Sequence, residues 1–385
     1  MKTAWALGGL LVIVGTILLA SGRPMGQRLF RWLPVPLWCY ALPLLAVTLG
    51  WLPRGHGAYR SLTDQLLPLA LACLLLGIDL PAVILAGGRA LVAAMIGAGG
   101  IVVGAPLGVW FLQAHLPVDA WKGAGALAGT WTGGTMNLLA LRSILEMPDA
   151  IFAPLIIVDA LVAYSWMAIL VAASAYQRPI DRWLRATTAV DAPGSHASVP
   201  EPSSKNRWRL AVCALMALGL SLGAGWLAAR LPTSQLVSSS TGWTILLVTT
   251  AALMLSLIPS LRRVGATGAA LGYPCLYLVL AATGVQASLE ALWSAPAWIL
   301  VGIWVALFHG GLLLLSGRFF RIPLGMLATA SQANIGGVVS APLVGAVYRQ
   351  DLAPIGLLLA LAGNAVGTYL GLLSAFLSRA FLGQF

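Results

Sequence analysis

The chain has 385 residues, of which 59% are apolar and only 9% are charged, and its mean hydropathy is +0.91. A water-soluble domain carries about a quarter charged residues, so this composition excludes a soluble enzyme or binding domain. At roughly 20 residues per transmembrane helix, the apolar residues suffice for about eleven or twelve spans. The formal net charge of +11 comes from bases in short connectors, which is typical of cytoplasmic loops and does not indicate nucleic-acid binding.

Apolar runs separated by polar breaks predict an all-α polytopic membrane protein with about 10 to 12 transmembrane helices. In chain order, the predicted spans are 4–20, 33–52, 64–86, 89–112, 120–146, 151–176, 209–230, 242–258, 269–286, 295–315, 323–347 and 352–378. The polar segment 177–208 is rich in Pro, Ser and Arg and predicts a disordered cytoplasmic linker. It separates an N-terminal transmembrane repeat, 1–176, from a C-terminal one, 209–385, and we expect both to lie in a bacterial-type inner (cytoplasmic) membrane.

Three short elements recur in the two halves in the same order, at offsets of about 200 to 207 residues. Leu67-Pro68-Leu69 matches Tyr273-Pro274-Cys275, Gly129 to Gly134 matches Gln332 to Gly337, and Ala153-Pro154 matches Ala353-Pro354. Many transporters are built from duplicated units of this kind. The span count predicts an even number of spans between the units, so an inverted or a parallel orientation of the repeats stays open.

The first of two polar interruptions lies inside the predicted span 120–146, where Ala128 to Asn137 reads AGTWTGGTMN. Adjacent glycines disfavour a continuous helix by roughly 1 kcal/mol each, so the run predicts a break. Backbone groups exposed at such a break are tolerated in a membrane where they line a cavity, and they bind ions and anionic groups there. The expected site residues are Thr130, Thr132, Gly133, Gly134, Thr135 and Asn137.

The second interruption, Ala330 to Gly337, reads ASQANIGG and has the same character, with two added amides. We expect both segments to be discontinuous helices. Close helix packing through small residues is the alternative explanation of the glycines. The second set of expected site residues is Ser331, Gln332, Asn334, Gly336, Gly337 and Ser340, with Asn364 at a comparable depth in the last span.

Asp159 lies near the middle of the predicted span 151–176. A carboxylate there costs about 2.5 to 3.5 kcal/mol on insertion scales, so such acids usually face a cavity and take part in ion or proton pathways. We therefore expect Asp159 to couple transport to H⁺ or to bind Na⁺. The alternative is a structural carboxylate satisfied by neighbouring hydroxyl and amide groups.

Other polar residues have simpler interpretations. Asp79 and Gln286 are expected to cap helix ends, and His309 to be a satisfied histidine of the helix core. Arg142, Glu146 and Asp149 follow the first break and are expected to occupy a connector rather than a site. The chain shows no pattern for a cofactor, and its four cysteines and scattered histidines indicate neither a disulfide framework nor a metal site.

These motifs resemble the YjcL-like family of uncharacterised integral membrane proteins, the domain of unknown function number eight-one-nine. The resemblance is carried by 129–137 followed by Asp159, and by 330–337 followed by Gly367-Thr-Tyr-Leu-Gly371. It extends over most of the chain from about Arg31. The family is similar to cation/proton antiporters and bile-acid-type sodium symporters, which implies two broken helices that cross at mid-membrane beside an ionisable residue. The family pattern has an amide directly after this acid, whereas here Ala160 follows Asp159, so the resemblance does not identify the coupling ion.

We therefore expect a secondary active transporter of a small organic, anionic solute, coupled to H⁺ or Na⁺, in which a core domain moves against a panel domain. Its expected partners are membrane lipid, the solute and the coupling ion, with a homodimer as an option. A non-transporting sensor or assembly protein is the alternative. A membrane-embedded enzyme acting on lipid-linked substrates is disfavoured, since no catalytic constellation is evident.

Overall fold

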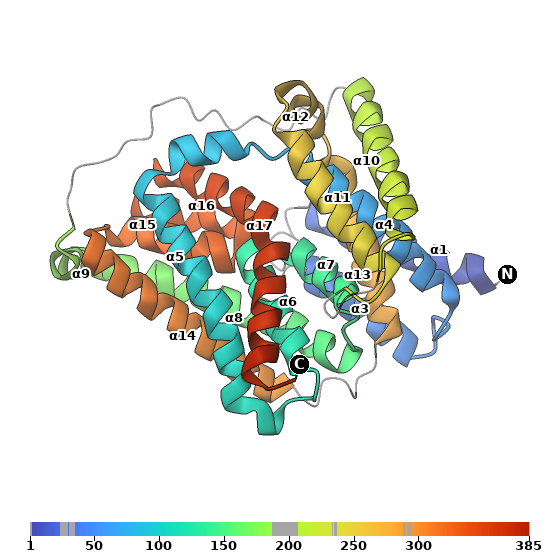
Figure 1. The fold of residues 1–385 in the computed structure, drawn as a ribbon, viewed down its shortest axis with the longest axis horizontal. Helices are drawn as coiled ribbons and strands as arrows, with labels where there is room; N and C mark the ends of the chain where they lie inside the picture. Colours follow the sequence, from blue (N-terminus) through green and yellow to red (C-terminus); the bar gives the residue numbers. More distant parts are fainter. Residues whose placement is uncertain are drawn as a thin grey trace. The chain divides into compact units, whose positions relative to one another are not determined.

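The computed structural model describes residues 2–23, 35–186, 207–232, 237–287 and 295–384, together with the single residues Phe30, Ser234 and Glu290. In this part of the chain all regular structure is helical and no strand occurs (Figure 1). Seven of its helices are long and apolar enough to cross a membrane, or eight if one bent pair is counted. The prediction of an all-α polytopic membrane protein is thus confirmed.

The structure has fewer long spanning helices than the number of spans predicted from the sequence, and this difference has a structural cause. Two of the predicted spans, 120–146 and 323–347, are each two short helices separated by a glycine. Another, 33–52, is represented by the 14-residue helix α3, Val35–Thr48. Each predicted span still overlaps a helix or a pair of helices, because apolar runs bounded by polar breaks locate the elements well.

The helices form two compact units, each discontinuous in sequence. Unit 1 comprises residues 1–77, 142–160 and 202–295, and unit 2 comprises residues 78–141, 161–201 and 296–385. Each unit takes residues from both sides of the segment 177–208. The compact units therefore do not follow the predicted halves of the chain.

Unit 1 is organised around helix α13. Its helices are α1 (Lys2–Ser21), α3, α4 (Gly57–Leu75), the end of α7 (Thr135–Ile144), the first part of α8 (Asp149–Ala173), α10 (Arg207–Ala228), α11 (Ser240–Ser256), α12 (Pro259–Gly265) and α13 (Ala269–Gln286). Helix α13 packs against both α3 and α4. The approach is close because a Cβ at Gly284 would collide with the carbonyl oxygen of Tyr40, and one at Gly268 with that of Cys73. Small residues thus allow the backbones of three helices to meet.

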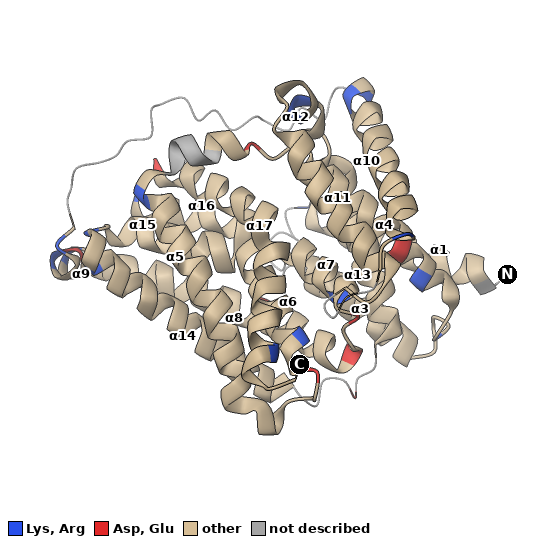
Figure 2. Ribbon diagram, in the orientation of Figure 1, with Lys and Arg blue, Asp and Glu red and all other residues tan. Residues whose placement is uncertain are grey.

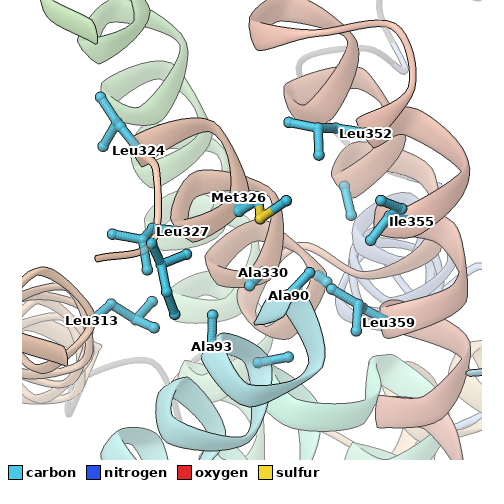
Figure 3. Close-up of a cluster of buried hydrophobic side chains, with 14 of the residues drawn as sticks. Ala90, Ala93, Leu313, Leu324, Met326, Leu327, Ala330, Leu352, Ile355 and Leu359 are labelled. Atoms are coloured by element: carbon cyan, nitrogen blue, oxygen red, sulfur yellow. The ribbon is translucent and has the colours of Figure 1, made fainter. Parts of the chain in front are cut away.

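Unit 2 is organised around two long helices, α5 and α17. Its elements are α5 (Leu80–Leu112), η1 (Gln113–His115), α6 (Ala120–Gly133), most of α7 (Thr135–Ile144), the second part of α8 (Asp149–Ala173), η2 (Ser174–Tyr176), α9 (Gln177–Leu184), α14 (Ala295–Phe320), α15 (Leu324–Ile335), α16 (Gly337–Tyr348) and α17 (Leu352–Phe381). Both α5 and α17 contact α6 and α15. One core cluster joins Ala90 and Ala93 of α5, Leu327 and Ala330 of α15, and Leu359 of α17 (Figure 3).

Two predicted boundaries are wrong. The predicted span 64–86 ends early, because α4 stops at Leu75 and Asp79 starts α5 by accepting a hydrogen bond from Ala82 N at 3.0 Å. The expected cap at Asp79 is thereby confirmed, and the predicted break near residue 88 is only a kink, at Gly88 (φ 41°).

The predicted linker 177–208 begins with helix α9 and ends with the start of α10. Residues 187–206 of that prediction lie outside the described residues.

Candidate functional site

The first polar interruption is the tip of a helical hairpin. Helix α6 ends at Gly133, Gly134 adopts a positive φ of 76°, and α7 begins at Thr135. Leu141 of α7 lies beside Gly129 of α6, where a Cβ would collide with its side chain. In one continuous helix these two residues would be roughly 18 Å apart. The chain therefore folds back at Gly134.

The second interruption has the same architecture. Helix α15 ends at Ile335, Gly337 has a φ of 75°, and α16 returns along α15. At the base of this hairpin, a Cβ at Gly325 would lie 3.0 Å from Cβ of Tyr348. The breaks thus occur at the predicted glycines, but the expected crossing helices are wrong. A glycine in the left-handed region reverses the chain where L-residues would resist it, and each segment returns on itself.

Both hairpins pack on α17, from opposite ends of that helix. At one end, Gly325 and Gly345 contact Leu352 at the start of α17. At the other, Arg379 near the end of α17 lies over the ring of Trp121 at the start of α6. The tip of the first hairpin meets α17 at Gly363, and α6 contacts both α15 and α16. The two tips therefore converge near the middle of α17, which Figure 1 shows passing beside α6 and α16.

A stripe of glycines on each helix brings α6 against α17. Every fourth residue is glycine in both, at Gly125, Gly129 and Gly133 of α6 and at Gly363, Gly367 and Gly371 of α17. A Cβ at Gly371 would lie 2.7 Å from the carbonyl oxygen of Gly125, and one at Gly133 would lie 2.6 Å from that of Gly363. The alternative interpretation of the first glycine run, close packing through small residues, therefore holds alongside the break.

Asn137 is the polar centre of the first tip. Its amide nitrogen donates to the carbonyl oxygens of Gly133 and, at 3.3 Å, of Asn364, while its amide oxygen accepts a hydrogen bond from the Thr368 hydroxyl at 2.6 Å. Asn137 is buried, whereas Gly134, Thr135 and Asn364 are only half-buried. The half-buried groups are those a ligand can reach. The other predicted residues here, Thr130 and Thr132, are buried in α6, and the Thr132 hydroxyl bonds to the Ala128 carbonyl at 2.7 Å.

The second tip is held by Gln332. Its side-chain nitrogen donates to the Ser340 hydroxyl across the hairpin at 2.9 Å, and Gly336 N closes the end of α15 on the Gln332 carbonyl at 2.9 Å. The Gln332 side-chain oxygen is buried without a hydrogen-bond partner among the described residues. It therefore offers a free acceptor beside the half-buried Gly336 and Gly337.

Two further predicted residues, Ser331 and Asn334, face neighbouring helices rather than the tip. Asn334 donates to the Ala94 carbonyl of α5 at 3.0 Å. The Ser331 hydroxyl receives a hydrogen bond from Nε1 of Trp166 at 2.9 Å and lies 2.8 Å from Nε2 of His309. Because Nδ1 of His309 faces the Gly97 carbonyl at 2.8 Å, that nitrogen must carry the proton. His309 is thus a satisfied core histidine, as predicted, but its link to α15 through Ser331 could not be read from the sequence.

No acidic side chain lies at either tip in the described part of unit 2. Three of its described acids precede helices, where Asp79 caps α5, Asp119 pairs with Lys122 and Asp351 pairs with Arg349. The fourth, Asp181 within α9, accepts a hydrogen bond from Leu324 N at the start of α15. The Arg349 guanidinium holds the pKa of Asp351 below its usual value through the hydrogen bonds between them. The tips present uncharged amides, hydroxyls and backbone groups.

Asp159 belongs to unit 1. It lies on α8, half-buried, two residues before that helix enters unit 2 at Leu161. The proximity of Asp159 to the hairpin tips stays a prediction.

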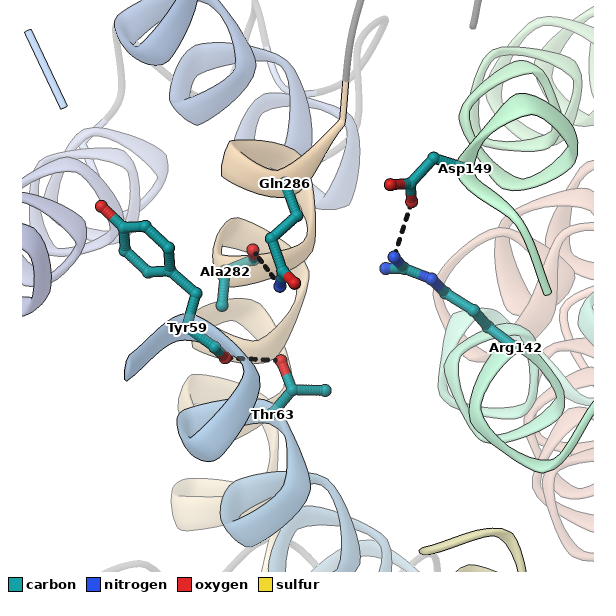
Figure 4. A network of polar contacts seen from close by, with 6 residues as sticks. All are labelled: Tyr59, Thr63, Arg142, Asp149, Ala282 and Gln286. Atoms are coloured by element: carbon teal, nitrogen blue, oxygen red, sulfur yellow. Dashed lines mark hydrogen bonds and ion pairs between the residues drawn. The ribbon is translucent and has the colours of Figure 1, made fainter. Parts of the chain in front are cut away.

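The charged residues after the first break form a packed cluster of unit 1. Arg142 forms an ion pair with Asp149 (Figure 4), with Nη2 and Oδ1 2.7 Å apart, and its guanidinium stacks 4.4 Å from the Phe152 ring centre. Glu146 accepts a hydrogen bond from the Ser238 hydroxyl at 2.9 Å. Only Glu146 therefore lies in the connector as predicted, because Arg142 belongs to α7 and Asp149 begins α8. Gln286, which the same figure shows at the end of α13, bonds to the Ala282 carbonyl at 2.9 Å.

Comparison with known proteins agrees with the predicted resemblance. The model of a family described as "Protein of unknown function (DUF819)" matches residues 9–381. The chain is 24% identical over 395 residues to "Uncharacterized membrane protein YjcL" of Bacillus subtilis (strain 168), a match that covers 95% of this chain and 96% of YjcL. The wider similarity to cation/proton antiporters and bile-acid symporters stays a prediction.

Proposed function

The chain belongs to the DUF819 family of membrane proteins, and we propose that it is a secondary active transporter whose solute binds between the two hairpin tips of unit 2. Unit 2 is the core domain that carries the solute, and unit 1 is the panel domain against which it moves. The two hairpins are the counterparts of an inverted duplication, since they enter along α17 from opposite ends.

The observation that carries this proposal is the convergence of two helix breaks in one compact unit. A broken helix in a membrane leaves N–H and C=O groups without partners, and such groups are tolerated only where protein, water or a ligand satisfies them. Here the breaks at Gly134 and Gly337 meet near the middle of the 30-residue helix α17. A transporter binds its solute at this depth, where the site can open to each side of the membrane in turn.

The chemistry of the tips favours a small anion. Some carbonyl groups at the ends of α6 and α15 already accept hydrogen bonds. The Thr130 carbonyl accepts one from Gly134 N, and the Gln332 carbonyl accepts one from Gly336 N. Within the described part of the chain no side chain caps the start of α16, so its first N–H groups are open to a ligand. Helix N-termini bind anionic groups, and among the described residues of unit 2 no carboxylate stands at the tips to repel one.

Asp159 is the proposed coupling residue. An acid within a membrane span is a proton- or cation-binding group by default. Because α8 runs unbroken through the boundary between the units, at residues 160 and 161, a change in the charge of Asp159 acts on a helix common to both. The coupling ion is H⁺ or Na⁺.

The charges of unit 2 orient the protein. Arginines gather around α9 and the end of α14, as Figure 2 shows. They are Arg178, Arg182, Arg185, Arg318 and Arg321. By the positive-inside rule this end faces the cytoplasm, together with the segment 187–206 that follows it. The membrane is of the bacterial inner type.

Uptake into proteoliposomes tests the proposal. A panel of radiolabelled mono- and dicarboxylates is offered under an inward Na⁺ or proton gradient. We expect one gradient to drive accumulation, Asn364→Ala to weaken solute uptake several-fold, and Asp159→Asn to abolish the response to the gradient. Gln113→Ala, which removes an exposed amide from η1 of the same unit, is the matched control. If folded protein accumulates no member of the panel under either gradient, a non-transporting sensor or assembly protein becomes the better assignment.

A further inference from the structure

Helix α9 is an amphipathic helix at one end of unit 2. Leu184 is fully buried and packs against Leu327 and Gly317, and Ile180, one turn earlier, joins the same core cluster. Arg178 and Arg182, also four residues apart, are exposed on the outer side. The apolar face of α9 thus packs on the core of unit 2, which leaves its arginines on the outer side.

The end of α14 adds to the same surface. Arg318 stacks on the ring of Trp183 at 5.7 Å, which places the ends of α9 and α14 side by side. Arg185 and Arg321, the residues that follow these two regions, are both exposed and both adopt a positive φ. Together with Arg178 and Arg182 these residues form a five-arginine surface.

Within the described residues, the one carboxylate on this surface is Asp181 of α9, a single acid against five arginines. Asp181 is the nearest acid in sequence, and its Oδ1 accepts a hydrogen bond from Leu324 N at 2.7 Å, at the start of α15. Asp351, the other acid near this end of α17, pairs with Arg349 at 2.8 Å. The surface therefore carries unbalanced positive charge.

Exposed aromatic side chains surround the arginines. Tyr176 is 65% exposed, Trp183 51% and Phe319 79%. Aromatic rings collect at the headgroup level of a bilayer. This location agrees with the ends of two spanning helices here, α8 at Ala173 and α14 at Phe320.

We propose that the five-arginine surface of α9 and α14 binds the headgroups of anionic phospholipids in the adjoining leaflet. Guanidinium groups match phosphate geometry in paired hydrogen bonds, and basic residues near an anionic surface each contribute to the attraction. The exposed rings anchor the surface at the depth of the lipid phosphates. Asp181 of α9 accepts a hydrogen bond from the first N–H group of α15. Lipid bound to α9 therefore also stabilises the second hairpin, whose tip is at Gly337.

Bilayer composition tests the proposal directly. Purified full-length protein is placed in nanodiscs of phosphatidylcholine alone or of phosphatidylcholine with a minor fraction of phosphatidylglycerol, and thermal unfolding and lipid retention are measured in both. Wild type should unfold at a higher temperature with phosphatidylglycerol, because a ligand of the native state stabilises it. High salt should reduce the difference by screening the charges.

The test variant is the double substitution Arg178→Gln/Arg182→Gln. We expect about a fivefold loss of affinity for phosphatidylglycerol per arginine, or about 1 kcal/mol each. The matched control, Arg207→Gln/Arg263→Gln, removes the same charge from α10 and α12 of unit 1 and should keep more of the phosphatidylglycerol effect than the test variant. Unchanged unfolding temperatures in pure phosphatidylcholine show that the variants fold. If the double variant does not fold, Arg321→Asn replaces it, since asparagine tolerates the positive φ of that position.

Three outcomes overturn the proposal. One is equal stabilisation of wild type by both bilayers, and another is an equal response of the test and control variants. The third is stabilisation by inorganic phosphate in pure phosphatidylcholine that matches the lipid effect, which would assign the surface to a soluble anion. This experiment does not depend on solute transport, so its result and that of the uptake assay are separable.

Discussion

Thr368 of α17 donates its hydroxyl hydrogen to the amide oxygen of Asn137 of α7, across 2.6 Å. Both side chains are buried, at 0% and 1% exposure. Through this bond, and through the bond of Asn137 to the Asn364 carbonyl, the returning helix of the first hairpin is held on α17. The tip of the hairpin is therefore fixed by polar contacts as well as by glycine packing.

Replacing Thr368 by valine should destabilise unit 2. The change preserves shape but leaves the buried Asn137 oxygen without its donor, which costs about 1 to 3 kcal/mol. Thermal unfolding of the purified protein measures the effect. Thr249→Val is the matched control, because Thr249 of α11 is also fully buried and its hydroxyl has no partner in the described structure. A control variant as unstable as Thr368→Val would contradict the role of the hydrogen bond.

Gly337→Ala tests the reversal of the second hairpin. The position has open space around it but a φ of 75°, so the added methyl group meets no atom and acts only through backbone strain of about 1 to 2 kcal/mol. We expect lower stability and impaired uptake. Gly311→Ala in α14 also enters open space, at an ordinary helical position, and should be neutral or stabilising by up to about 1 kcal/mol. Equal effects of the two substitutions would mean that the positive φ does not matter.

Gly371→Ala tests the glycine contact of α6 and α17 away from the tips. The new methyl group would lie 2.7 Å from the Gly125 carbonyl oxygen, so the helices must separate, and overpacking of this kind costs roughly 1 to 3 kcal/mol. Gly99→Ala of α5, where nothing lies within 4 Å, is the control. A melting temperature for Gly371→Ala equal to that of the control would show that the contact tolerates a side chain.

Much of the fold is local information and could be predicted. Apolar runs mark the helices, and α13 begins and ends where the predicted span 269–286 does. The Gly-Gly pairs at 133–134 and 336–337 marked both breaks, because the absence of a Cβ is a property of single residues. Helix α9 had a local signal as well. Ile180 and Leu184 are four residues apart, as are Arg178 and Arg182, so a helix places the two pairs on opposite faces, but the surrounding polar composition obscured this pattern.

The sequence by itself thus determined the membrane class, the helices, the family and the positions of the breaks. Only the tertiary structure decided that the broken helices turn back as hairpins, that their tips meet on α17, and that His309 reaches α15 through Ser331. It also assigned Asp159 to unit 1, whereas the residues of the tips belong to unit 2. Hydropathy and backbone freedom act on neighbouring residues, whereas these arrangements depend on contacts such as that of Asn137 with Thr368, 231 residues apart.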